Sequence, residues 1–429
     1  MRRRNPWWIP PFLGRVPEPL QDSQLKLLGA VALAMLFEEY DAAMLTSALK
    51  QIADSLLLAD ERLGLYLALI RLGALPALFV IPFADRIGRR PVFLASTAAM
   101  GLVTFATAFS QTALQFVLLQ GLTRTFFVAG SAVALVIISE EFPAAHRGWG
   151  LGMLAALGAV GNGLGAAIYS QIDRLPYGWR SLYAIGLIPV LLIPFLSRRV
   201  SETRRFERHA SDTLVVGHVG AGTFRRLIEP LAALSSQHPG RAAAVALTGF
   251  LASIATLPSF QFSGYFVQGR LGFTPAQYSM MVIGGGAIGI IGNVVAGRLG
   301  DSIGRKRVGF VLWALFPLAS FGLYRGTASI AVVAWIALVF CSMGGRVILR
   351  ALATELFPTA YRGAASGMFA VIETLGAVVG LLALYFYGTT NLDEIGLVIP
   401  LCAHTALPTA LLLLRFPDTH QRELEAIHS

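Results

Sequence analysis

The chain has 429 residues, 34 Lys and Arg against 24 Asp and Glu, and a formal net charge of +10. Hydrophobic residues make up 55% of it and charged residues only 14%, whereas soluble domains carry about 25% charged residues. This composition excludes an ordinary soluble enzyme and a disordered protein, and it predicts an all-α membrane protein. Both cysteines, Cys341 and Cys402, lie in apolar runs, so we expect neither a disulfide framework nor a metal site.

A helix that crosses a hydrocarbon core of about 30 Å needs about 20 mostly apolar residues. Twelve such runs are bounded by charged residues, proline or polar turns: 27–49, 63–82, 91–110, 113–139, 148–171, 180–197, 242–266, 276–296, 308–325, 329–354, 363–387 and 394–414. The longest polar stretch separates six runs from six. We therefore expect an N-terminal arm (1–26), a six-helix bundle (27–197), a linker (198–241), a second six-helix bundle (242–414) and a tail (415–429).

The Lys and Arg residues between these runs indicate the orientation of the chain. If both termini lie in the cytoplasm, 24 of them fall on cytoplasmic segments and 6 on outer segments, and cytoplasmic loops do carry most of the positive charge in membrane proteins. The chain also lacks an Asn-x-Ser/Thr sequon. We therefore expect a multi-pass protein of a bacterial inner membrane with both termini cytoplasmic. The cytoplasmic segments of a protein embedded in a lipid bilayer then account for most of the net charge, and no nucleic-acid partner is expected.

Two charged motifs recur in the second half of the chain at an offset of roughly 215 residues. Residues 85–89 read Asp-Arg-Ile-Gly-Arg and residues 301–305 read Asp-Ser-Ile-Gly-Arg, while a glutamate that precedes a Phe-Pro pair occurs at the end of the fourth and the tenth run. Acidic and basic groups at these positions can pair and bias a two-state element, which predicts gating. The residues expected to act in gating are Asp85, Arg89, Glu140, Asp301, Arg305 and Glu355.

Residues 297–307, Gly-Arg-Leu-Gly-Asp-Ser-Ile-Gly-Arg-Lys-Arg, resemble the signature loop of the major facilitator superfamily, and the resemblance covers essentially the whole chain. Residues 37–41, Phe-Glu-Glu-Tyr-Asp, resemble the first-helix pattern of metabolite–proton symporters, and residues 178–183 and 202–206 are similar to motifs of the sugar-porter and metabolite-symporter branches. The resemblance implies two pseudo-symmetric bundles, a central cavity lined by spans one, four, seven and ten, and a monomer. Ile81 stands where the family usually has glycine, so helix packing at the first loop is expected to differ.

Ionisable residues at membrane depth cost at least about 2.5 kcal/mol each and usually mark function. The predicted spans contain eight of them: Glu38, Glu39, Asp41, Arg71, Arg124, Arg346, Arg350 and Glu373. A rise of about 1.5 Å per residue predicts that Asp41 meets Arg71, that Glu38 meets Arg124, and that Arg346 lies near the level of Glu373.

These charges suggest separate roles for the acids and the arginines. Three carboxylates within four residues are more than pairing needs, so we expect one to carry a proton, with Asp41 the first candidate, Glu38 the second and Glu39 a further member of the cluster. Arginine binds carboxylates bidentately, which predicts an anionic substrate. The residues expected to contact the substrate are Arg71, Arg124, Arg346, Arg350, Gln261, Tyr265 and Glu373.

The leading interpretation is a secondary active transporter that works by alternating access and carries a small organic anion, such as a carboxylate, in symport with protons. No cofactor is expected, because the Gly-rich run 284–289 lies inside an apolar span with no strand before it. The alternatives are a proton-coupled exporter of drug-like or amphiphilic compounds, a uniporter or exchanger, and a non-transporting membrane sensor. A separate alternative for the eight charges is that all of them form structural pairs. An enzyme is not expected, since no nucleophile–base pair falls at membrane depth.

Overall fold

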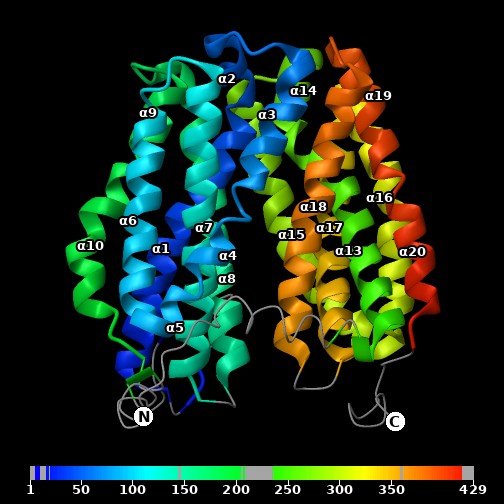
Figure 1. The fold of residues 1–429 in the computed structure, drawn as a ribbon. Helices are drawn as coiled ribbons and strands as arrows, with labels where there is room; N and C mark the ends of the chain where they lie inside the picture. The colour runs from blue at the N-terminus through cyan, green and yellow to red at the C-terminus, as the bar shows by residue number, and fades with distance from the viewer. Residues whose placement is uncertain are drawn as a thin grey trace. The chain divides into compact units, whose positions relative to one another are not determined.

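The computed structural model describes residues 5–9, 16–18, 20–143, 146–203, 206–207, 234, 236–357 and 361–417. Within these residues all regular elements are helices (Figure 1). Ten helical segments of the described chain are long and apolar enough to cross a membrane. Much of the predicted arm, linker and tail lies outside the described residues, including Arg204 and Arg205 of the 202–206 motif.

The helices follow the predicted apolar runs closely, and each of the twelve runs overlaps at least one of them. The first half of the chain forms α1 (Asp22–Ser47), α2 (Leu49–Leu56), α3 (Asp60–Leu72), α4 (Ala77–Val80), α5 (Phe83–Ile87), α6 (Arg89–Thr107), α7 (Ala113–Glu141), α8 (Arg147–Tyr169), α9 (Trp179–Ala184) and α10 (Leu187–Arg199). The second half forms α13 (Pro239–Gln261), α14 (Ser263–Arg270), α15 (Pro275–Ile303), α16 (Arg305–Arg325), α17 (Ala328–Glu355), α18 (Arg362–Tyr387), α19 (Leu392–Ala403) and α20 (Ala406–Arg415).

The second predicted run is interrupted where a single helix was expected. α3 ends at Leu72, four residues before Pro76, because a proline ring collides with the carbonyl group four residues earlier and supplies no N–H. Gly73 then packs against α7, where an added Cβ would lie 2.1 Å from the Gly121 carbonyl oxygen. Thr125 donates its hydroxyl to the Gly73 carbonyl at 2.6 Å and so satisfies a carbonyl that the break leaves outside the helix.

The chain forms two compact units, which we call unit 1 and unit 2. Unit 1 comprises residues Met1–Met44, Gly73–Ile168 and Arg174–Ala221, and unit 2 comprises Leu45–Leu72, Tyr169–Asp173 and Gly222–Ser429. One boundary therefore falls at the helix break between Leu72 and Gly73. The units assign residues 45–72 and 169–173 to the second body, whereas the sequence placed them in the first bundle, and the predicted bundle limits stay a prediction.

Close helix contact fixes α1 inside unit 1. Gly161 of α8 lies directly on the α1 backbone, and an added Cβ would come within 1.9 Å of the Leu36 carbonyl oxygen. Two residues later, Gly163 has no heavy atom within 4 Å of the same position. The backbone of the α1 segment that carries the acidic cluster therefore packs directly against the backbone of α8.

We expect Gly161→Ala to lower the unfolding free energy by about 1–3 kcal/mol, because the methyl group must push α1 away from α8. Gly163→Ala is the matched control, since its methyl group enters open space and alanine favours the helix by about 0.5–1 kcal/mol. Thermal unfolding of the two purified variants in one detergent checks this. Equal midpoints would contradict the close contact.

The internal repeat also has a backbone signature. Gly88 precedes α6 with φ 111° and ψ 155°, and Gly304 precedes α16 with φ 104° and ψ 132°. Residues other than glycine rarely adopt a φ in this range. The two motifs that recur in the sequence therefore adopt the same turn, which starts a helix at an arginine in both places.

Candidate functional site

The acidic cluster lies on α1, in unit 1. Glu38 and Asp41 are three residues apart and share a helix face, and their side chains are 0% and 6% exposed. Glu39 is half-buried and lies beside Gly158 of α8, as a 100° step along the helix predicts. Two carboxyl groups are thus removed from solvent inside unit 1, and the third lies on a different side of α1.

Asp41 is surrounded by hydrogen-bond donors. Thr104 of α6 donates its hydroxyl to Asp41 Oδ1 at 2.9 Å, and the Gln120 side chain of α7 also hydrogen-bonds to the carboxyl group. Gln120 Nε2 in turn donates to the Thr107 hydroxyl at 3.3 Å. The sequence analysis missed these partners, because a hydroxyl or an amide changes the hydropathy of the apolar runs 91–110 and 113–139 very little.

Glu38 has a poorer environment. Ser131 of α7 donates its hydroxyl to Glu38 Oε2 at 2.6 Å. The other oxygen, Oε1, is buried and has no hydrogen-bond partner in the described part of the chain. An added Cβ on Gly130 would lie 2.7 Å from Oε1, so the glycine leaves the space that this oxygen occupies.

Arg124 of α7 is the basic residue that the sequence assigned to this region. It is half-buried, and its charge interacts with both Glu38 and Asp41. Its Cζ also lies 4.5 Å from the centre of the Phe127 ring, in a cation–π contact. Arg71, the partner predicted for Asp41, belongs to unit 2 at the end of α3, so that pair stays a prediction.

In unit 2, three of the predicted residues come together. Arg346 and Arg350 lie four residues apart on α17, and their Nη2 atoms are 3.5 and 3.7 Å from the two carboxylate oxygens of Glu373 on α18. Their side chains are 44% and 62% exposed, against 18% for Glu373. Two partly exposed guanidinium groups therefore share one carboxylate.

The two polar residues predicted at the seventh span have different environments. Gln261 ends α13, and its Nε2 atom is buried without a hydrogen-bond partner among the described residues. Tyr265, in α14, is buried and donates its hydroxyl to Asp60 Oδ1 at the start of α3. The Gln261 amide can therefore donate to a further acceptor, whereas the Tyr265 hydroxyl already donates to Asp60. The contact between Tyr265 and substrate stays a prediction.

The repeated motifs form matching charge clusters, which we call the N-terminal and C-terminal triangles. In the N-terminal triangle, Arg89 lies 3.0 Å from Asp85 and 3.2 Å from Glu140. In the C-terminal triangle, Arg305 lies 3.2 Å from Asp301 and is hydrogen-bonded to Glu355. The pairing that the repeat predicts is thus present in both units.

Glu202 reinforces the N-terminal triangle, and the sequence analysis had not assigned it to the site. Its Oε1 atom accepts the Arg89 backbone N–H at 2.9 Å, and its Oε2 atom accepts that of Arg90 at 3.2 Å. A carboxylate at this position satisfies free N–H groups at the start of α6 and complements the helix dipole. The sequence feature that could have identified Glu202 is its position as an acidic residue soon after the sixth apolar run.

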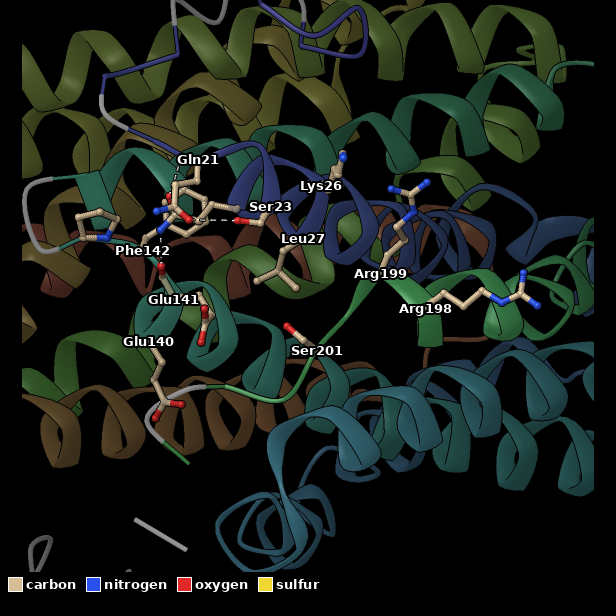
Figure 2. Close-up of a pocket in the computed structure, with 12 residues that line it drawn as sticks. Gln21, Ser23, Lys26, Leu27, Glu140, Glu141, Phe142, Arg198, Arg199 and Ser201 are labelled. Atoms are coloured by element: carbon tan, nitrogen blue, oxygen red, sulfur yellow. Dashed lines mark hydrogen bonds between the residues drawn. The ribbon is translucent and has the colours of Figure 1, made fainter. Parts of the chain in front are cut away.

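A cavity of about 720 Å³ opens beside this triangle in unit 1, at the end predicted to face the cytoplasm. Glu140 and Glu141 line one side of it, while Lys26, Arg198 and Arg199 lie on the other side (Figure 2). The α1 residue Leu27, which lines it, is about 16 Å along the helix from Glu38. The cavity therefore belongs to the triangle region and not to the buried carboxylates.

Comparison with known proteins agrees with this architecture. A family model described as Major Facilitator Superfamily matches residues 31–418. The gallate transporter of Pseudomonas putida is 26% identical over an alignment of 392 positions that covers 85% of each chain. The putative niacin/nicotinamide transporter NiaP of Bacillus subtilis is 25% identical over 94% of this chain and 98% of its own. Among solved structures, a D-xylose–proton symporter has the same fold, with a TM-score of 0.73 at 18% identity over 92% of this chain and 98% of that chain.

Proposed function

Because the chain belongs to the major facilitator superfamily and is a multi-pass transporter rather than an enzyme, we propose that it carries a small aromatic carboxylate across the membrane together with a proton. The proposal includes twelve spans in two six-helix bundles, both termini in the cytoplasm of a bacterium, and a monomer. Gallate and niacin, which name two of the relatives, are both carboxylates on an aromatic ring.

The observation that carries this proposal is the division of the intramembrane charges between the two units. Unit 1 contains three carboxyl groups on α1 and one intramembrane arginine, Arg124, which acts on Glu38 and Asp41. Unit 2 contains three of the predicted intramembrane arginines, Arg71, Arg346 and Arg350, and one intramembrane carboxylate, Glu373, which pairs with the latter two. Surplus charge of one sign is costly at membrane depth. A proton reduces the acidic surplus of unit 1, and a bound anion reduces the basic surplus of unit 2.

The anion site that we propose is the Arg346–Glu373–Arg350 cluster. A guanidinium group offers a planar pair of N–H donors that matches a carboxylate, and Arg346 is exposed enough to present them. A neutral sugar or a cation would leave these donors uncompensated, which favours an anionic cargo over the drug-export alternative.

The proposed gates are the two triangles. Each arginine joins two acidic residues that come from different helices of its own unit. Arg89 and Glu140 have side chains only 14% and 10% exposed, so their attraction is less screened than that of a surface pair. Such pairs stabilise one conformation of a two-state element.

Purified protein in liposomes that contain a trapped pH-sensitive dye tests this function. Nicotinate and nicotinamide form a matched pair of substrates, since they share a ring and differ in carboxylate against amide. We expect nicotinate or gallate to acidify the lumen faster than in protein-free liposomes, whereas nicotinamide and xylose give no signal.

Three other outcomes of this experiment would support a different transport function. Labelled-substrate counterflow without proton movement would make the protein a uniporter or exchanger. Equal uptake of nicotinamide would remove the need for an anion. Transport of lipophilic cations instead of acids would favour an exporter of amphiphilic compounds.

A further inference from the structure

Glu38 and Asp41 share one face of α1 but have different numbers of hydrogen-bond donors. Asp41 accepts from the Thr104 hydroxyl at 2.9 Å and is also bonded by Gln120. Glu38 has one partner, the Ser131 hydroxyl, on Oε2. The whole Glu38 side chain is buried. Its Oε1 atom nevertheless lacks a hydrogen bond among the described residues.

An ionised carboxylate needs more partners than Glu38 has. It presents two oxygens with about four acceptor sites, all of which are hydrated in water, and burial of the charge without donors is strongly unfavourable. A neutral carboxylic acid needs only an acceptor for its O–H. The Ser131 hydroxyl can accept as well as donate, and 2.6 Å is within the usual range for an O–H···O bond.

The charged residues near Glu38 also favour its neutral form. The charges that act on Glu38 are those of Glu39, the next residue on α1, and of Arg124 on α7. Glu39 opposes a second negative charge beside it, while Arg124 also acts on Asp41, which has the donors that stabilise a carboxylate. Arg124 and the donors around Asp41 therefore stabilise an ionised Asp41, which leaves Glu38 as the neutral member of the cluster.

We propose that Glu38, rather than Asp41, holds the transported proton in this conformation, as a carboxylic acid bonded to Ser131. Asp41 is then the permanent counter-ion of Arg124. The protonation follows from the geometry around Glu38, and only its role in coupling rests on the proposed symport. Release of the proton requires a conformation in which Oε1 gains a donor or solvent.

Infrared difference spectroscopy of the purified protein at neutral pH tests the protonation without any substrate. A carboxylic acid has a carbonyl stretching band that a carboxylate lacks. We expect Glu38→Gln to remove such a band, and Asp41→Asn and the control Glu39→Gln to remove carboxylate bands instead. Ser131→Ala should shift the Glu38 band without removing it, because the carboxyl group loses its partner. A carbonyl band that Glu38→Gln leaves in place, or that Asp41→Asn removes, would overturn the assignment.

The coupling role has its own measurement, the number of protons moved per labelled substrate in liposomes. This ratio should fall to background in Glu38→Gln even where substrate movement can still be measured, a result that a loss of folded protein does not produce. An unchanged ratio would overturn the coupling role. If the wild type moves substrate without protons while the infrared band still depends on Glu38, the symport proposal fails and the protonation assignment stands.

Discussion

Replacement of Arg346 by glutamine is expected to slow carboxylate transport by about 100-fold, which corresponds to about 3 kcal/mol of lost charge-assisted hydrogen bonding. Arg346 is the less exposed of the two arginines that share Glu373, so its interaction with an anion is the less screened by water. Uptake of labelled nicotinate or gallate at several concentrations checks this.

The neighbouring arginine supplies the control for this prediction. Arg350→Gln removes the same charge from the same face of α17, but the Arg350 side chain is 62% exposed, and we expect a smaller loss. Arg346→Lys retains the charge without the planar pair of donors, and its transport rate should lie between those of the wild type and Arg346→Gln. Equal rates for wild type and Arg346→Gln would show that this cluster does not bind the substrate.

Charge reversal in the C-terminal triangle is expected to have the second largest effect. Arg305→Glu places a third carboxylate next to Asp301 and Glu355, and repulsion at about 4 Å in partly buried surroundings is worth about 4 kcal/mol. Transport should therefore fall strongly. The double reversal Arg305→Glu with Glu355→Arg restores the attraction between the two positions and should recover part of the activity.

The N-terminal triangle provides a matched comparison. The same double reversal of Arg89 and Glu140 is expected to recover less, because Glu140 Oε2 also accepts the Thr203 hydroxyl at 2.6 Å, a bond that an arginine cannot accept. Transport rate and thermal midpoint are measured together in all variants. If neither double reversal recovers any transport, the pairs do not act through mutual attraction.

The sequence predicted the parts of the fold that depend on local chemistry. Apolar runs of about 20 residues gave the helices, because a membrane helix must satisfy its own backbone and cover itself with apolar side chains. The motif at residues 85–89 and its copy at 301–305 gave the paired charges, since charge and glycine were conspicuous in both places. The 1.5 Å rise of a helix also brought Glu38 to the level of Arg124, whereas it assigned Asp41 to Arg71, and Arg124 acts on Asp41 as well.

The hydrogen-bond partners of uncharged polar side chains could not be predicted from the sequence in the same way. Thr104, Gln120 and Ser131 lie in apolar runs where a hydroxyl or amide has little effect on hydropathy, and which acid they meet depends on how α6 and α7 pack against α1. The bond between Tyr265 and Asp60 joins positions about 200 residues apart and has no local signal.

The sequence by itself therefore determined a helical membrane protein with eight ionisable residues inside its predicted spans, because composition and periodicity are properties of the chain alone, and its resemblance to a known family added the expectation of transport. Only the tertiary structure decided that residues 45–72 pack with unit 2, which moves Arg71 there and increases the acidic surplus of unit 1 and the basic surplus of unit 2, and that Glu38 lacks the donors that Asp41 has. Those outcomes depend on contacts between distant segments, where close approach at Gly73 and Gly161 selects which side chains meet.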